Sequence, residues 1–377
     1  MSAEGRRKMA EKKRLANYEL LRMIAMVMVV VLHFLSHSDS LLSLETSVSG
    51  VRILGTLLES FCLVAVNVYI LISGYFGVKS SYHPIKAVSL LCQIWFYAFF
   101  LLAAAMLLGL PTGLREMGIY GAVKYLFPIE SETYWFATSY LMLYLISPVL
   151  NRGARELSQK QLQITIGGLL VLFCVVKSIS PVAFPVDRYG YDLPWFICVY
   201  LIAAYLGLYG SDFWKKHGLL IYAGSSLLTF GMVVALWFVA RRWDSFSYYF
   251  TVPFHYNFLL CLTGAIGLFY SFSHLRIKEG KMAAAIRKLG ALSFGVYLFH
   301  EHMDIRPVWY EYLKRILNPA GKEGIGVFFR ELLGSVVILF AVGIFIDVIR
   351  SLLFAAVGKK LAKTAAGRKL QSFADEK

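Results

Sequence analysis

The sequence predicts an all-α fold, a polytopic bundle of about ten transmembrane helices. Of the 377 residues, 58% are hydrophobic and only 16% are charged, whereas about a quarter of the residues in soluble domains are charged. The mean hydropathy is +0.62, and apolar runs long enough to cross a bilayer recur along the whole chain. A helix satisfies its own backbone hydrogen bonds in lipid, so each run is expected to be helical.

The expected spans follow these apolar runs. They lie at roughly residues 17–36, 53–77, 85–110, 133–150, 161–180, 194–210, 218–240, 254–272, 289–310 and 326–350. Together they form one membrane domain, residues 17–350, between basic tails at 1–16 and 351–377. The mixed segment 111–132 is too polar for a span and is interpreted as interfacial.

The distribution of Lys and Arg predicts that both termini face the cytoplasm. With ten spans, most basic residues fall in the segments that share a side with the N-terminus, as the positive-inside rule requires. The same rule accounts for the net charge of +15, so no nucleic-acid partner is expected. The first apolar run is too long for a cleaved signal peptide, which predicts a retained first span.

Signatures of several other enzyme classes are missing from the sequence. It contains no G-x-x-x-x-G-K-[ST] phosphate loop, no H-E-x-x-H and no G-x-S-x-G. This excludes an ATP-driven pump and argues against a serine or zinc hydrolase. The cysteines lie in apolar runs without C-x-x-C spacing, so we interpret them as packing residues and expect no disulfide. They are Cys62, Cys92, Cys174, Cys198 and Cys261.

The first apolar run carries polar groups on one face. Arg22 and His33 are eleven residues apart, just over three helical turns, which places them on the same face about 16 Å apart along the axis. Glu19 precedes Arg22 by three residues and can pair with it. Such groups at depth usually face a cavity. The alternatives are a snorkelling anchor for Arg22 and an outer-interface position for His33.

The second run brings further polar residues to the same depths. Glu59 is expected near the level of His33, where its carboxylate could accept a hydrogen bond from one imidazole nitrogen and leave the other as a base. A structural pair with another helix is the alternative for Glu59. Asn67 lies deeper, and Ser73 and Gly74 come near the level of Arg22.

The ninth run ends in a second polar cluster, which comprises His300, Glu301, His302, Asp304 and Arg306. On a continuous helix, Tyr297, His300 and Asp304 would share a face. The two histidines of H-x-H would point apart, so a metal site is not expected. The remaining interpretations are an outer pocket for an acceptor and a local salt-bridge network.

Four sequence elements, in order along the chain, resemble the membrane acyltransferase-3 family. "ELLRMIAMVMVVVLHF" contains the R-x10-H motif of the first helix, and "VNVYILISGYF" is similar to the second-helix element. "YWFATSYLMLYLISPVLN" is similar to the W-F segment with its following Tyr, and "LSFGVYLFHEHM" is similar to S-x-x-x-Y-L-x-H. Asn67 and Tyr69 depart from the usual residues of the second element. The resemblance covers residues from about 15 to 350.

The resemblance implies acyl transfer from cytoplasmic acyl-CoA, usually acetyl-CoA, to a hydroxyl of an envelope carbohydrate such as lipopolysaccharide, capsule or peptidoglycan. It implies a bacterial cell membrane and membrane lipid as surroundings, with acyl-CoA as a substrate and no permanently bound cofactor. His33 would be the general base, with a covalent acyl-imidazole as a less favoured route, and Glu59 would orient it. The donor residues would be Arg22, Ser73 and Gly74, and the acceptor residues would be Asn67, Trp135, Tyr140, Tyr297 and His300.

Two other functions remain open from the residues alone. A transporter or flippase for an envelope glycan or lipid would use the polar face of the first helix as a substrate path. A membrane sensor would bind an envelope ligand without turning it over. Release of free CoA thiol distinguishes the enzyme from both.

Overall fold

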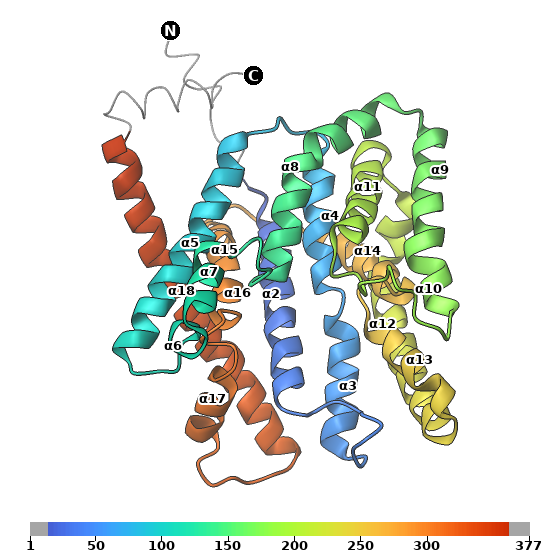
Figure 1. Cartoon of the computed structure of the whole chain (residues 1–377). Coiled ribbons are helices and arrows are strands. Elements are labelled where there is room, and N and C mark those ends of the chain that lie inside the picture. The colour runs from blue at the N-terminus through green and yellow to red at the C-terminus, as the bar shows by residue number, and fades with distance from the viewer. Residues whose placement is uncertain (1–13, 362–377) are drawn as a thin grey trace.

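The protein is a bundle of helices in the computed structural model, which describes residues 14–361 (Figure 1). These residues contain no strand, so the predicted all-α fold is confirmed. Eight helical segments are long and apolar enough to cross a membrane. Two further predicted spans correspond to α8 and α11, and the count of ten spans stays a prediction. Of the predicted tails at 1–16 and 351–377, residues 1–13 and 362–377 lie outside the described residues.

The helices that build the bundle follow one another with short connections. They are α2 (Ala16–His37), α3 (Gly50–Cys62), α4 (Ala65–Gly77), α5 (Pro84–Leu107), α6 (Gly113–Met117), α7 (Ile119–Leu126), α8 (Trp135–Glu156), α9 (Gln159–Leu170), α10 (Val176–Ile179), α11 (Leu193–Tyr209), α12 (Asp212–Arg242), α13 (Ser247–Thr251), α14 (Leu259–Ser273), α15 (Lys281–Leu292), α16 (Phe294–His300), α17 (Trp309–Leu317) and α18 (Ile325–Leu361).

Several predicted spans are interrupted helices. The second span consists of α3 followed by α4, and the fifth joins α9 to α10 through a π-helical turn at Val171–Val175. The last span continues as α18 to Leu361, past the predicted end of the membrane domain at residue 350. The ninth span ends at His300, ten residues before its predicted end, because the chain turns there before α17.

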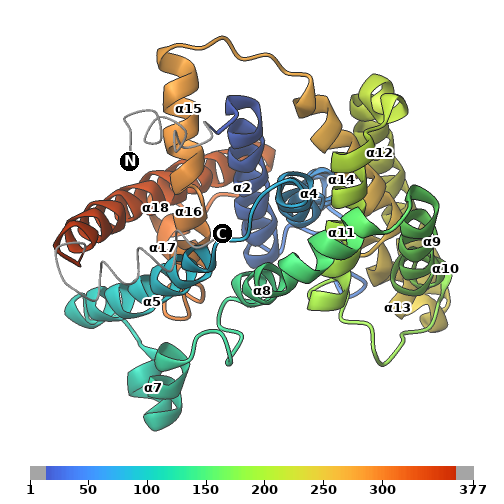
Figure 2. The same cartoon turned by 90° about the horizontal axis from the view of Figure 1, so that it is seen from above.

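Helix α2 occupies the middle of the bundle. Figure 2 shows it between α15 and α16 on one side and α4 on the other. Many of its apolar side chains are buried, as Leu21, Ala25 and Phe34 illustrate. These faces of α2 are held by packing against the neighbouring helices. Polar groups on the same faces are positioned by those neighbours.

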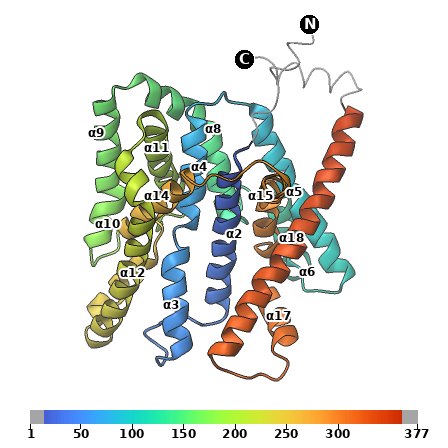
Figure 3. The ribbon, with the colours of Figure 1, turned by 180° about the vertical axis from the view of Figure 1, so that it is seen from behind.

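Helices α12 and α14 pack against each other through glycine. A Cβ atom on Gly218 would lie 2.6 Å from the carbonyl oxygen of Gly267, which is closer than real Cβ contacts. Small residues at such crossings let the two backbones approach, and this close packing is the main attraction between helices in lipid. In Figure 3 this pair lies to one side of α3 and α4.

The first described helix begins on the side of the bundle where the last described helix ends. Ala16 opens α2 on the side where α18 ends, and the loops after α2 and α17 lie on the opposite side (Figure 1). We call these the near side and the far side. The cytoplasmic orientation of the near side stays a prediction.

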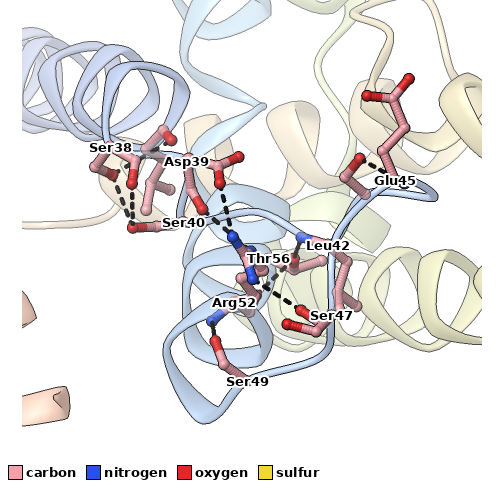
Figure 4. A network of polar contacts seen from close by, with 11 residues as sticks. Ser38, Asp39, Ser40, Leu42, Glu45, Ser47, Ser49, Arg52 and Thr56 are labelled. Carbon is pink, nitrogen blue, oxygen red and sulfur yellow. Dashed lines mark hydrogen bonds and ion pairs between the residues drawn. The ribbon is translucent and has the colours of Figure 1, made fainter. Parts of the chain in front are cut away.

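The loop that joins α2 to α3 on the far side is organised around Arg52 (Figure 4). Its guanidinium lies 2.7 Å from the Asp39 carboxylate and donates to the Ser47 carbonyl at 2.8 Å. Ser49 caps the first turn of α3 through the Arg52 N–H, and the Leu42 N–H donates to Thr56. These contacts fix the far end of α2, which carries His33 one turn earlier.

Candidate active site

One face of α2 borders a small cavity inside the bundle. Met26, Val29 and His33 contribute to its wall, and Arg22 lies one turn before Met26 on the same face. The cavity measures about 20 Å³, which is room for about one water molecule. The residues that line it are Met26, Val29, His33, Val66, Tyr69, Trp135, Phe136, Tyr256, Phe294 and Tyr297.

The cavity wall is apolar and aromatic, with His33 as its titratable base. Trp135 packs against Tyr191 at 4.4 Å and against Tyr256 at 5.8 Å between ring centroids. Of the residues that the sequence singled out, His33, Trp135 and Tyr297 meet here. Phe136, Phe294 and Tyr256 are lining residues that the sequence analysis did not assign, because apolar and aromatic residues are common in every helix of this chain.

The imidazole of His33 is held by residues at the end of α16. His33 Nδ1 lies 2.8 Å from His300 Nε2 and 3.4 Å from the Glu301 carboxylate. His300 Nδ1 lies 2.6 Å from the Val296 carbonyl oxygen. His300 is fully buried and Glu301 is 6% exposed, so this contact is screened little by water.

These contacts set the protonation of both rings. The Val296 carbonyl can only accept, so a neutral His300 carries its proton on Nδ1 and presents a lone pair on Nε2. His33 Nδ1 then donates to His300, which leaves His33 Nε2 without a proton and available as a base. The arrangement is that of a base whose tautomer is fixed by a second group.

Glu301 gives the cluster a compensating charge. Its carboxylate lies 3.4 Å from His33 Nδ1 and 3.8 Å from the Arg306 guanidinium. When His33 takes up a proton, the resulting imidazolium has this carboxylate beside it. The sequence placed Glu301 in a polar cluster but could not pair it with His33, because 268 positions of chain separate the two.

The ninth segment corrects the sequence interpretation. Since α16 ends at His300, Asp304 does not share a helix face with Tyr297. Asp304 instead accepts from the Gly113 N–H at 2.9 Å and from the Tyr125 hydroxyl at 2.7 Å, which ties α6 and α7 to the bundle. His300 and His302 are therefore not on one continuous helix, on which the prediction of no metal site depended.

The distances among the possible ligand atoms bear on whether a metal ion fits here. Ligand atoms of His33, His300 and Glu301 lie within 4.8 Å of one another. Two nitrogens on one tetrahedral zinc would be about 3.3 Å apart, given bonds of about 2.0–2.1 Å. The 2.8 Å between His33 Nδ1 and His300 Nε2 fits a hydrogen bond better. The expectation of no metal stays a prediction.

Glu59 does not contact His33, contrary to the expected hydrogen bond between them. Its Oε2 atom is buried without a hydrogen-bond partner among the described residues, while His33 Nδ1 is engaged by His300 and Glu301. Equal depth on two helices does not decide which way the side chains point. An orienting role for Glu59 has no support from this geometry.

On the near side, the expected donor residues lie around Arg22. Its guanidinium forms an ion pair with Glu19, as the spacing predicted, and its side chain is 29% exposed. The Tyr69 hydroxyl donates to the Arg22 carbonyl at 2.7 Å. The Ser73 hydroxyl lies one turn further along α4, 3.2 Å from the hydroxyl of Tyr140, so these two predicted residues meet.

Asn67 and Gly74 have structural positions instead of ligand-facing ones. The Asn67 amide donates to the Tyr256 carbonyl at 2.8 Å and its oxygen accepts from Trp195 Nε1 at 2.9 Å, with no side-chain surface exposed. A Cβ atom on Gly74 would lie 2.6 Å from the Tyr200 carbonyl oxygen, so this glycine is needed for contact with α11. These positions give no support to substrate contacts of the two residues, which stay predictions.

A comparison with protein families identifies the chain. The model of a family described as an acyltransferase domain, acyltransferase-3, matches residues 15–349. This chain belongs to the acyltransferase-3 family. Searches of the curated proteins and of the solved structures gave no match. The resemblance deduced from the four sequence elements is therefore confirmed, and the protein is a multi-pass membrane acyltransferase.

Within this acyltransferase the motif residues separate into two groups. Trp135, Tyr297 and His33 meet at the central cavity, whereas Ser73 and Tyr140 lie near Arg22 on the near side. His300 reaches the site through His33 and does not line the cavity. The structure shows a contact of His300 with His33, and the expected acceptor role of His300 stays a prediction.

Proposed function

We propose that this acyltransferase moves an acyl group from cytoplasmic acyl-CoA to a hydroxyl of a carbohydrate on the opposite side of a bacterial cell membrane. The observation that carries the proposal is the position of His33, which lines a cavity within the bundle while its Nδ1 lies 2.8 Å from His300 Nε2. Membrane lipid surrounds the protein, and acyl-CoA is a substrate, not a resident cofactor.

The chemistry proceeds with His33 as the general base. His33 Nε2 takes the proton of the acceptor hydroxyl as its oxygen attacks the thioester carbonyl, and a C–O bond forms. The tetrahedral intermediate then collapses, the C–S bond breaks, and CoA leaves as a thiol with the proton that His33 returns. Glu301, 3.4 Å from His33 Nδ1, stabilises the imidazolium between these two proton transfers.

The donor approaches from the near side. Arg22 is eleven residues before His33, so its Cα lies about 16 Å away along the helix axis. A pantetheine arm of about that length would place the thioester at His33 while the phosphates of CoA remain near Arg22. Glu19 already pairs with Arg22, so a phosphate would either share the guanidinium with this carboxylate or displace the carboxylate.

Acetyl is proposed as the transferred group because acetyl-CoA is the usual donor that the family resemblance implies. At about 20 Å³ the cavity holds about one water molecule, so it must widen to admit any acyl group. The aromatic rings of Trp135, Tyr191 and Tyr256 are the kind of surface on which the apolar face of a sugar ring stacks. This lining supports a carbohydrate acceptor.

The function is tested by mass spectrometry of surface glycans in cells with the gene, without it, and with His33→Gln. We expect acetyl groups on a glycan only with the wild-type gene, and release of CoA thiol from acetyl-CoA by the purified wild-type protein. His33→Gln should abolish both while acetyl-CoA still binds. Unchanged glycans together with no thiol release would contradict the proposal and favour a transporter or a sensor.

A further inference from the structure

Helix α8 begins at the cavity that contains His33. Its first two residues, Trp135 and Phe136, are part of the cavity wall. The N–H groups of residues 135–137 find no backbone acceptor in the described part of the chain, and no side chain caps this end. The start of a 22-residue helix carries a partial positive charge and is suited to a negative group.

A second observation points to the same place. Tyr297 lines the cavity and is 4% exposed, and its hydroxyl has no hydrogen-bond partner among the described residues. The ring of Tyr297 lies 6.0 Å from that of Phe136 between centroids, and Phe136 is the second residue of α8. A buried hydroxyl without a partner costs free energy, so its persistence at a site suggests a ligand that it can bind.

The proposed reaction needs a hydrogen-bond donor for the thioester carbonyl oxygen in this cavity. When the acceptor oxygen attacks the thioester, the carbonyl oxygen becomes negatively charged, and the charge is generated in a cavity with apolar walls. Preorganised donors aimed at such an oxygen are usually the largest single contribution to catalysis of acyl transfer. His33 supplies the base but has no donor left for this oxygen.

We propose that the Tyr297 hydroxyl and the N-terminus of α8 form the oxyanion site of this acyltransferase. The inference rests on the proposed function. Tyr297 donates its O–H to the carbonyl oxygen of the thioester as the acceptor's C–O bond forms, and the N–H of Phe136 polarises that hydroxyl or donates directly. When the C–S bond breaks and the C=O bond is restored, the oxygen that accepts from Tyr297 is again that of a neutral carbonyl.

The test compares Tyr297→Phe with Tyr134→Phe in the purified full-length protein. Each variant loses one hydroxyl, but that of Tyr134 already donates to the Leu298 carbonyl at 3.1 Å and Tyr134 does not line the cavity. The reaction followed is CoA thiol release from acetyl-CoA with water as the surrogate acceptor. We expect Tyr297→Phe to lower kcat by roughly 10²-fold with KM within about twofold, and Tyr134→Phe to change kcat little.

Two further measurements separate an oxyanion role from a structural one. Because the Tyr297 hydroxyl has no partner to lose, Tyr297→Phe should not lower the melting temperature, whereas Tyr134→Phe should lower it. The infrared carbonyl band of bound acetyl-CoA labelled with ¹³C should lie at lower frequency in the wild type than in Tyr297→Phe, because a donated hydrogen bond weakens the C=O bond.

The outcomes distinguish this inference from the proposed function. If the wild type releases thiol and Tyr297→Phe retains its kcat with an unshifted carbonyl band, the oxyanion site is refuted and the function stands. If the wild type neither binds acetyl-CoA nor releases thiol, both fail together. A lowered kcat that is matched by a lowered melting temperature would assign Tyr297 a structural role and also overturn the inference.

Discussion

Replacing His300 tests the arrangement of the base. His300→Leu keeps much of the side-chain volume but removes the acceptor for His33 Nδ1, which lies 2.8 Å from His300 Nε2. It also leaves the Val296 carbonyl, 2.6 Å from His300 Nδ1, without that partner. His300 has no exposed surface, so water cannot easily replace either bond.

The expected effects follow from these two contacts. Two hydrogen bonds worth about 1 kcal/mol each give a loss of about 2 kcal/mol in the free energy of unfolding. The bond to His33 strengthens when the ring becomes an imidazolium, to about 1.5–3 kcal/mol. Only the gain over the ground-state bond, about 0.5–2 kcal/mol, counts toward kcat, so its loss should lower kcat by roughly 2- to 30-fold. His300→Gln offers an amide oxygen to His33 and should recover part of this rate.

The assay is the initial rate of CoA thiol release from acetyl-CoA at saturating donor, with thermal unfolding measured in parallel. His33→Gln serves as the comparison and should be inactive. If His300→Leu turned over at the wild-type rate, the tautomer argument would be wrong. If both His300 variants were inactive while His33→Gln retained activity, His300 would be the base itself.

Three other predictions follow from the geometry. Arg22→Ala should weaken acetyl-CoA binding, measured by calorimetry, and Arg22→Lys should restore it only in part because an ammonium cannot make the paired phosphate contacts of a guanidinium; unchanged affinity would return Arg22 to an anchoring role. Glu59→Gln should leave thiol release within about threefold of wild type and should not lower stability, since the buried carboxyl has an unpartnered oxygen; a loss comparable with that of His33→Gln would revive the orienting role. A cysteine placed at Ser38 should react only with reagents added on the outer face, and labelling from the cytoplasm would reverse the topology.

The sequence determined the kind of protein and the position of its candidate base. Apolar runs without water to satisfy the backbone leave helices as the available structure, so the fold class required no tertiary information. The eleven-residue spacing placed Arg22 and His33 on one face of α2 because the helical period is a local property. The four motifs also identified the family, which the comparison confirmed.

The tertiary structure decided which polar groups meet. Glu59 and Glu301 are both carboxylates at suitable positions in the sequence, but only Glu301 reaches His33. The direction of a side chain depends on how its helix is rotated against its neighbours, and this rotation is fixed by packing throughout the bundle. Asn67 shows the same limit, since its partners Tyr256 and Trp195 lie far along the chain.

The end of α16 marks the boundary between the two kinds of information. An apolar run predicted a helix through residue 310, yet the helix ends at His300 and the following turns bring Glu301 to His33 while Asp304 anchors α6 and α7. The sequence alone established which chemical groups are present, through residue type and helical period. Which of them face one another was decided by the packing of α2, α8 and α16 around a common cavity, because such contacts join residues hundreds of positions apart.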